Sequence, residues 1–480
     1  MNIRDFLLQQ KNSNKIAIKC GEEQITYKAL HNRCEIISSF LLKHFSKSDN
    51  IIIFLPNSID FVVAYFSIIY AGKTAVPLGS SSKEPEIDYC IKQCNSKLII
   101  TNSNQIKNTG KLKGEINILY IDEFKDDIVK EIIQTSKYNK TVVMLSTSGT
   151  TSKPKKVMLS DENIYFNIIG LLELLPLKEN DIPLVVLPFS FSYGHTAQML
   201  LYIYLGLTFV IMDSFFMVNS FLNLINKESI TYFEAVPSLL IMILKYAKND
   251  MLNNIWSIGF VGDKISNYVM DKLIDKYPHI KFLQVYGQTE ASPIITKLEI
   301  NKYLEKRYSV GKPISGVKIK IVKDGINCFP NVIGDIFVSG PNIMKGYYQN
   351  PEETEKKIIN GYLDTGDLGW FDEDGYLYIK GRKDNLIISG GMNISPEEVE
   401  EVIRMHPAVE EACAFPEQDE ILGKAVSVRV VYSESVSENE LINFCSERLS
   451  SYKVPRRITF VDYLPKTESG KYKKQKNEER

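Results

Sequence analysis

Short apolar runs rich in β-branched residues alternate with segments of helical periodicity along most of this 480-residue chain. A strand that is buried on both faces forms a continuous apolar run, and helices between such strands join parallel neighbours. We therefore predict an α/β fold, with a large N-terminal domain of stacked, mostly parallel, helix-covered sheets. The predicted strands are residues 51–55, 98–101, 142–145, 184–187, 209–212 and 282–285.

The second half of the chain differs from the first in composition. After about Gly325 glycines and turns become frequent, as in the Asp-Glu-Asp-Gly turn at 372–375, which indicates antiparallel strands. We expect a β-rich subdomain at 325–381, completing an N-terminal domain of residues 1–381.

A small α+β domain is expected at 385–480, after a hinge at 382–384. Ser395 precedes a proline and a helical pattern, which is typical of a capped helix start. The predicted elements are a helix at 396–405, a strand at 426–431 and a second helix at 437–449.

Composition excludes several classes of protein. Lys and Arg total 57 and Asp and Glu 58, so no global positive field attracts nucleic acid. The seven cysteines lack zinc-site spacing, and we expect reduced packing thiols. The N-terminal residues lack the apolar core of a signal peptide, and polar residues and prolines interrupt residues 51–78. We expect a cytoplasmic protein with no transmembrane segment.

A loop with hydroxyl side chains and lysines follows the strand predicted at 142–145. Its sequence is Leu-Ser-Thr-Ser-Gly-Thr-Thr-Ser-Lys-Pro-Lys at 145–155. Hydroxyls, backbone N–H groups and positive charge suit a polyphosphate, although such a loop is also typical of a solvated turn. The Gly-Lys-Ser/Thr of a Walker loop is absent.

This loop resembles the TSGTTGxPKG signature of the adenylate-forming (AMP-binding) superfamily, which includes acyl- and aryl-CoA ligases, peptide-synthetase adenylation domains and firefly luciferase. Ser152 and Lys156 stand where that signature has glycines. The resemblance implies that ATP contacts Thr147, Ser148, Gly149, Thr150, Thr151 and Lys155.

Further segments resemble the family's motifs in the family's order. Val-Tyr-Gly-Gln-Thr-Glu at 285–290 is similar to YGxTE. The resemblance implies that Tyr286 stacks on adenine, with Gly287 beside it, that Thr289 bonds the α-phosphate, and that Glu290 holds Mg²⁺. Residues 259–263 resemble the adenine-contacting turn, which implies roles for Gly262 and Asp263.

Tyr-Leu-Asp-Thr-Gly-Asp at 362–367 is similar to the family's WxxTGD, with Tyr362 in place of tryptophan. The resemblance makes Asp367 the carboxylate for both ribose hydroxyls, Arg382 a ribose or phosphate contact, and Asp384 the hinge residue. An aspartate in such a sequence is otherwise typical of a turn.

The last two motifs lie in the predicted C-terminal domain. Residues 390–400 resemble the loop that lines the pantetheine tunnel of CoA ligases, which implies that Gly390 and Gly391 let a thiol arm approach the backbone. Residues 464–471 resemble LPRTxSGK, which makes Lys471 the candidate catalytic lysine, with Thr289 and Glu290 as the other catalytic residues.

The resemblance implies that a carboxylic acid reacts with ATP and Mg²⁺ to give acyl-AMP and pyrophosphate. A thiol then takes the acyl group after the C-terminal domain rotates. We expect CoA as the acceptor. One alternative is a stand-alone acyl- or amino-acid-adenylating ligase that loads the phosphopantetheine of a carrier protein, and another is a non-catalytic binding homologue.

Residues 187–195 resemble the PLFHxxG segment of acyl-CoA ligases, with Phe191 in place of the histidine. Ser192 occupies the place of the aspartate that pairs with the substrate amine in α-amino acid adenylation domains. We therefore expect an aliphatic or aryl acid in a pocket lined by Phe191, Tyr193 and Val236, although these side chains also suit plain core packing. His195 either orients the substrate or simply caps a strand.

Overall fold

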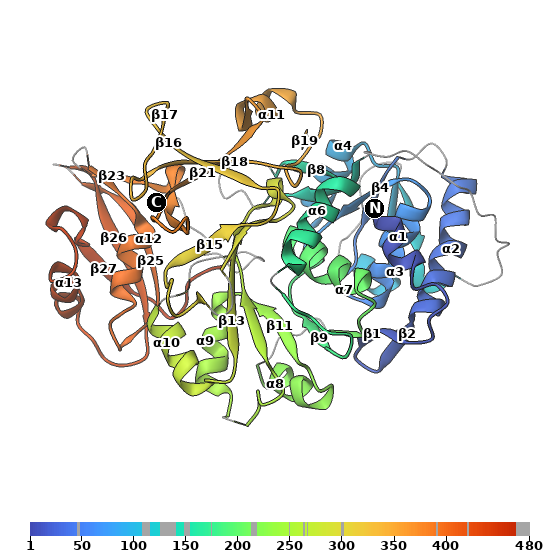
Figure 1. Ribbon diagram of the computed structural model, residues 1–480, viewed down its shortest axis with the longest axis horizontal. Coiled ribbons are helices and arrows are strands. Elements are labelled where there is room, and N and C mark those ends of the chain that lie inside the picture. Colours follow the sequence, from blue (N-terminus) through green and yellow to red (C-terminus); the bar gives the residue numbers. More distant parts are fainter. Residues whose placement is uncertain are drawn as a thin grey trace.

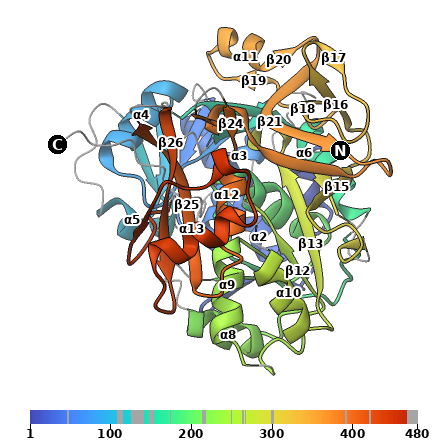
Figure 2. The same ribbon diagram turned by 90° about the vertical axis from the view of Figure 1, so that its left-hand side faces the viewer.

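The computed structural model arranges the chain as a large body with a smaller C-terminal unit at one side (Figure 1). Figure 2 turns that unit, from β23 (Ile387–Ser389) to β27 (Arg457–Phe460), toward the viewer. The structure describes residues 1–45, 49–107, 116–124, 141–147, 154–173, 175–212, 218–248, 250–262, 265, 267–298, 302–389, 392–419 and 422–466.

One sheet of the large body has the strand order β19-β8-β7-β4-β3-β5-β6. Its central strands β4, β3 and β5 are parallel and completely buried. This confirms the strands predicted at 51–55, 98–101 and 142–145. The bounds are β3 (Asn50–Ile53), β4 (Thr74–Pro77), β5 (Leu98–Thr101), β6 (Asn117–Tyr120), β7 (Thr141–Ser146), β8 (Lys156–Ser160) and β19 (Gly346–Tyr347).

The larger sheet begins with a parallel part. From β1 through β10, β9, β11 and β12 to β13 every neighbouring pair is parallel, and β2 is the edge strand, antiparallel to β1. The bounds are β1 (Ile16–Cys20), β2 (Glu23–Thr26), β9 (Pro183–Val185), β10 (Phe209–Ile211), β11 (Tyr232–Ala235), β12 (Ser257–Phe260) and β13 (Lys281–Gly287).

Antiparallel pairing in this sheet starts earlier than the sequence predicted. The chain turns back after β13, and β14 pairs with it in antiparallel fashion, about 30 residues before Gly325. A Cβ on Gly287 would overlap the Pro293 carbonyl group, so glycine is needed where the two strands meet. The remaining strands are β14 (Ile294–Lys297), β15 (Ser309–Pro313), β16 (Lys318–Lys323), β17 (Ile326–Asn327), β18 (Gly334–Ser339), β20 (Ile358–Ile359), β21 (Tyr362–Phe371) and β22 (Leu377–Arg382).

Helices cover both sheets (Figure 1). Side-chain caps define several helix starts: Thr26 accepts a hydrogen bond from Ala29 N, and Ser58 accepts one from Phe61 N. The helices are α1 (Ile3–Leu8), α2 (Tyr27–His44), α3 (Ile59–Tyr70), α4 (Glu84–Cys94), α5 (Ser103–Lys107), α6 (Asp161–Leu172), α7 (Leu201–Tyr204), α8 (Val218–Lys227), α9 (Pro237–Tyr246), α10 (Asn267–Lys276) and α11 (Pro351–Lys357).

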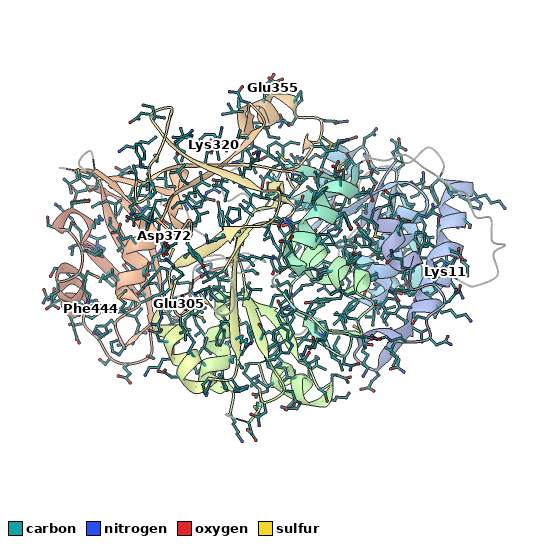
Figure 3. The ribbon with its side chains drawn as sticks, viewed as in Figure 1. Lys11, Glu305, Lys320, Glu355, Asp372 and Phe444 are labelled. Carbon is teal, nitrogen blue, oxygen red and sulfur yellow. The ribbon has the colours of Figure 1, made fainter. Side chains whose placement is uncertain are left out.

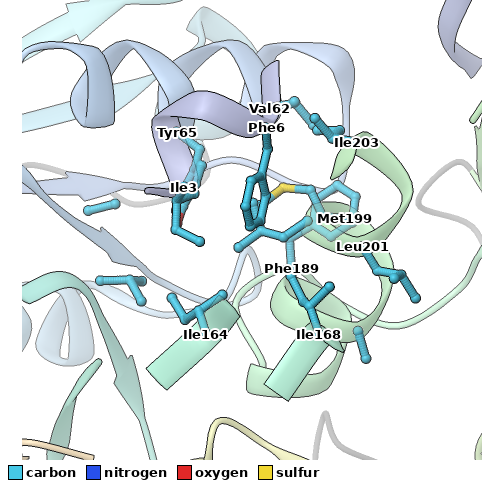
Figure 4. Packing of buried hydrophobic residues seen from close by; sticks show 14 of the residues in the cluster. Ile3, Phe6, Val62, Tyr65, Ile164, Ile168, Phe189, Met199, Leu201 and Ile203 are labelled. Atoms are coloured by element: carbon cyan, nitrogen blue, oxygen red, sulfur yellow. The ribbon is translucent and has the colours of Figure 1, made fainter. Parts of the chain in front are cut away.

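A large apolar core joins the two sheets. Phe6 of α1 and Phe189 lie among side chains from α3, α6 and the π-helical segment η2 (Gly194–Leu200) (Figure 4). A second core lies beneath α8, α9 and α10. Charged side chains such as Lys11, Glu305 and Glu355 lie at the outside (Figure 3). Among the described residues, no helix is long and apolar enough to span a membrane.

The C-terminal unit has its own core, formed by residues from Ile387 to Ile458. Ser395 accepts a hydrogen bond from Glu398 N at the start of α12, as predicted, and both predicted helices are present with earlier ends. The elements are β23 (Ile387–Ser389), β24 (Met392–Ile394), α12 (Pro396–Ile403), β25 (Val409–Asp419), β26 (Gly423–Tyr432), α13 (Glu438–Ser446) and β27 (Arg457–Phe460). The exact domain bounds and the hinge at 382–384 stay predictions.

We predict that Gly311→Ala destabilises the large body. Gly311 has a φ of +87°, and its Cβ would overlap the Lys297 carbonyl, which belongs to the backbone of the neighbouring strand. We expect a loss of about 2–4 kcal/mol. Gly325→Ala is the matched control, because Gly325 has a φ of +79° with no atom within 4 Å. It should cost only about 1 kcal/mol. Thermal unfolding of both variants tests this order, and equal midpoints would contradict it.

Candidate active site

The end of β13 lies against the hairpin of β21 and β22. The Tyr286 hydroxyl donates a hydrogen bond to Asp367 Oδ2 at 2.6 Å, and Arg382 Nη1 lies 3.4 Å from Asp367 Oδ1. Desolvation, followed by the Asp367 carboxylate, raises the pKa of Tyr286, so its hydroxyl stays protonated as a donor. Three side chains that the sequence assigned to the nucleotide therefore meet at one place.

Local hydrogen bonds shape the part of β21 that leads to Asp367. Gly366 N donates to Asp364 Oδ1 at 2.9 Å, and Asp367 N donates to Thr365 Oγ1 at 3.1 Å. Gly366 has a φ of +76°, a conformation that glycine adopts at little cost. Residues 365–367 lie inside β21, at a point where its register with β18 is irregular, so the Thr-Gly-Asp sequence forms an irregular part of a strand and not the expected turn. The two hydrogen bonds fix the backbone that carries the Asp367 carboxylate.

The Glu290 carboxylate, expected to hold Mg²⁺, is 8% exposed. Its Oε1 accepts a hydrogen bond from the Tyr347 hydroxyl at 2.8 Å. Lys155 Nζ lies 5.0 Å from the centre of the Tyr347 ring and 2.5 Å from Glu353 Oε2. Tyr347 therefore connects the end of the phosphate loop to the candidate metal carboxylate.

The described donor set fits a magnesium ion bound with a nucleotide. Among the residues that the structure describes, no group of three or more His, Cys, Asp or Glu side chains is placed to hold a metal ion. Magnesium is usually bound through one or two carboxylates, with waters and substrate phosphates completing the octahedron. A single fixed carboxylate such as Glu290 meets that requirement.

The phosphate loop connects β7 and β8, which form an antiparallel pair. Thr147 N donates to Lys155 O at 3.0 Å, and Lys155 N donates to Thr147 Oγ1 at 3.3 Å, which closes the base of the loop. Lys156, which replaces a family glycine, is 2% exposed and donates to Ser146 Oγ at 2.9 Å. The lysine at 156 is therefore part of the buried interior next to the loop and contacts the strand that precedes the loop.

Several predicted site residues lie outside the described residues: Ser148, Gly149, Thr150, Thr151, Asp263, Gly390, Gly391 and Lys471. Gly262 is described and has a φ of +93° after β12, in the turn expected to contact adenine. The backbone of Asp384 lies in the 3-10 turn η5 (Lys383–Asn385) that follows β22.

The segment that is expected to hold the acid lies next to Thr289, on the phosphate side of the site. Ser192 Oγ lies 3.1 Å from Thr289 Oγ1. Phe191, Tyr193 and Val236 are half-buried. Tyr193 packs against the core that joins the two sheets, and Val236 packs against the core beneath α8, α9 and α10. The candidate acyl wall therefore lies where the two cores meet.

His195 is completely buried in η2. Burial lowers its pKa to about 3, so the ring is neutral at physiological pH. Its Nδ1 lies 3.1 Å from Thr196 Oγ1. Its ring packs edge-on against the Tyr65 ring, with the two ring centres 4.9 Å apart. These contacts favour a role in the fold of η2.

The sequence predictions missed four residues near the site. Tyr347 and Glu353 contact Glu290 and Lys155, as described above. Lys357 is half-buried, and its Nζ lies 3.7 Å from the position that a Gly366 Cβ would occupy. Glu234 is completely buried in β11. The detectable signal for Glu234 was one acidic residue inside an otherwise apolar strand.

Comparison with known proteins supports this arrangement. Residues 8–348 match the model of the AMP-binding enzyme family, and residues 398–471 match its C-terminal domain. The 2-succinylbenzoate–CoA ligase of Bacillus subtilis is 32% identical over 474 residues, which cover 97% of this chain and 96% of that one. The ligase of the same name from Bacillus licheniformis is 32% identical, with 96% of both chains covered.

Solved structures agree with the sequence relatives. The B. subtilis O-succinylbenzoate coenzyme A synthetase with ATP and magnesium has a TM-score of 0.88 and 32% identity, covering 98% of each chain. Its complex with the acyl-adenylate intermediate has a TM-score of 0.87 and 31% identity, covering 98% of this chain and 96% of that one. The chain therefore belongs to the AMP-binding enzyme family and is an ATP-dependent, AMP-forming acid–thiol ligase.

Proposed function

We propose that this ligase activates an aryl or aliphatic acid and transfers its acyl group to CoA. The observation that carries the proposal is the contact of Tyr286, Asp367 and Arg382 beside Thr289 and Glu290. This group supplies a ribose acceptor, a cation and a metal carboxylate at one strand end. The full-length relatives are CoA ligases, which supports CoA as the thiol.

In the first step the acid's carboxylate oxygen attacks the α-phosphorus, and the bond to the bridging oxygen breaks to release pyrophosphate. Asp367 accepts hydrogen bonds from the ribose hydroxyls and fixes the nucleotide. Thr289 donates to the α-phosphate. A bound Mg²⁺ at Glu290 would neutralise phosphate charge. Lys471 bridges the two reacting anions, which otherwise repel each other.

In the second step the CoA sulfur attacks the acyl carbon. The thiol gives up its proton, the bond from the acyl carbon to the phosphate oxygen breaks, and AMP leaves. We propose that rotation about Asp384 removes Lys471 and brings the Gly390–Gly391 backbone beside the thiol arm. Such a hinge needs only a few residues to absorb the change in backbone angles.

The choice of acid depends on the wall near Thr289. Ser192 supplies no charge for a substrate ammonium group, which disfavours an α-amino acid. The relatives act on 2-succinylbenzoate, which carries two carboxylates. That acid is the reference against which aryl and aliphatic monocarboxylic acids are compared.

We also propose a cytoplasmic location. All seven cysteines are free thiols, in agreement with the expected reduced state. Free thiols fit a reducing compartment, and ATP and CoA are present there.

Pyrophosphate release over a panel of acids tests the function directly. We expect ATP-dependent release with at least one aryl or aliphatic acid, followed by formation of its CoA thioester. A purified carrier protein with its phosphopantetheine serves as the alternative acceptor. If none of the acids in the panel supports pyrophosphate release, the proposal is contradicted. If the acyl group is transferred only to the carrier protein, that protein replaces CoA as the proposed acceptor.

We predict that Asp367→Asn raises the KM for ATP. The amide cannot accept ribose hydrogen bonds at both atoms, and it has no charge. A loss of about 1.5–3 kcal/mol corresponds to about 10- to 150-fold. Asp374→Asn is the matched control, because Asp374 is an exposed turn residue paired with Lys306. Steady-state pyrophosphate release measures both variants, and equal KM values would contradict the role of Asp367.

We predict that Lys471→Ala slows acyl-AMP formation by about 100- to 1000-fold, because one charge-stabilising donor is lost. Transfer from a preformed acyl-adenylate to CoA should be retained. Lys474→Ala, in the same basic tail, is the control. Single-turnover assays of each half-reaction separate the two steps. Unchanged adenylation in Lys471→Ala would exclude the assigned role.

A further inference from the structure

The chain contains a buried carboxylate that the steps above do not use. Glu234 of β11 is 0% exposed. Its oxygens accept hydrogen bonds from the Tyr232 hydroxyl at 2.8 Å, the Tyr202 hydroxyl at 2.8 Å and Gln198 Nε2 at 2.9 Å. Burial raises the pKa of Glu234 above its ordinary value, and the hydrogen bonds offset this rise only in part. Burying a carboxylate among uncharged donors is costly. Its presence therefore favours a role beyond packing.

Glu234 is connected to the reacting end of the site through two adjacent residues. Ser192 Oγ lies 3.1 Å from Thr289 Oγ1, which is expected to bond the α-phosphate. The next residue, Tyr193, has its hydroxyl 3.5 Å from Glu234 Oε1. Tyr193 is half-buried, whereas Glu234 is completely buried. The short segment Ser192–Tyr193 therefore contacts Thr289 at one residue and Glu234 at the next.

Two acceptor atoms in this cluster, Gln198 Oε1 and Glu234 Oε1, can accept a hydrogen bond from a further donor. Gln198 Oε1 is buried and has no hydrogen-bond partner. Its amide orientation is fixed, because the Nε2 group must face the Glu234 carboxylate. The Tyr193 bond to Glu234 Oε1 is at the limit of hydrogen-bond length. A buried acceptor without a donor is unfavourable unless a ligand supplies one.

The neighbouring strand leaves space for the carboxylate. Gly259 of β12 pairs with Glu234 in the parallel register. A Cβ at Gly259 would lie 2.7 Å from Glu234 Cγ and 3.1 Å from the Tyr232 hydroxyl. Glycine at 259 is therefore needed for the Glu234 side chain to take this position, and the residue pair forms one unit.

We propose that Glu234 and Gln198 form the distal end of the acyl pocket and select acids whose far end carries a hydrogen-bond donor, a hydroxyl or amino group. The same negative charge disfavours acids with a second carboxylate, including 2-succinylbenzoate. This inference rests on the proposed function, since it assigns the substrate class of that site.

Two matched series of acids test the proposal. One series is benzoate, 3- and 4-hydroxybenzoate, and isophthalate and terephthalate. The other is hexanoate, 6-hydroxyhexanoate, 6-aminohexanoate and adipate, and 2-succinylbenzoate is measured beside both. We expect kcat/KM for pyrophosphate release to be at least about 10-fold higher for a donor-bearing acid than for its unsubstituted partner. The dicarboxylates should be the poorest substrates.

Glu234→Gln removes the charge with little change in shape. We expect the preference for the donor-bearing acid to fall about 10-fold and the dicarboxylate to gain about 10-fold relative to the unsubstituted acid. Ratios within one variant are compared, so a general loss of activity does not affect the result. Glu228→Gln, at a carboxylate paired with Lys19, is the matched control and should keep the wild-type ratios.

Gln198→Leu provides an independent variant if Glu234→Gln does not fold. It removes the unpartnered acceptor but keeps the charge, so the donor preference should fall while dicarboxylates remain poor substrates. Equal rates for donor-bearing and unsubstituted acids in the wild-type enzyme, or 2-succinylbenzoate as the best substrate, would overturn the inference and leave the proposed function intact. If no acid releases pyrophosphate, both fail.

Discussion

The register between β21 and β22 is the constraint on which the candidate nucleotide site depends. In this antiparallel pair Asp367 lies directly opposite Arg382, although 15 positions separate them in the sequence. In an antiparallel pair each residue has one defined partner on the neighbouring strand. A shift of the register by one position would therefore move each side chain to the opposite face of the sheet. The hydroxyl of Tyr286 then reaches the same carboxylate from β13.

Two other contacts extend the site from this hairpin. Tyr347 connects Glu290 to the end of the phosphate loop, and Ser192 connects Thr289 to the residues around Glu234. The first link consists of side-chain contacts, and the second consists of side-chain contacts made by the adjacent residues Ser192 and Tyr193. The site therefore consists of one strand end, β13, with a phosphate side and an acyl side.

Much of the fold could be predicted because apolar periodicity is a local property. The strands predicted at 98–101 and 142–145 are present as β5 and β7, since continuous apolar runs are found in strands buried on both faces. The start of antiparallel pairing was placed too late, because β14 has the same apolar character as its parallel predecessors. Strand direction depends on the length and path of the connection, which periodicity does not report.

From the sequence by itself we could predict the chemistry: a hydroxyl-rich loop, a candidate ribose carboxylate, a candidate metal carboxylate and their order along the chain. Only the tertiary structure decided which of these groups meet. It placed Tyr347 beside Glu290, and it placed Glu234 beside Tyr193. The physical reason is that residue type and spacing fix local conformation, whereas contacts between distant segments arise from the packing of whole elements. Glu234 is the clearest case, because a lone acidic residue in a strand acquires its meaning from the uncharged donors that surround it.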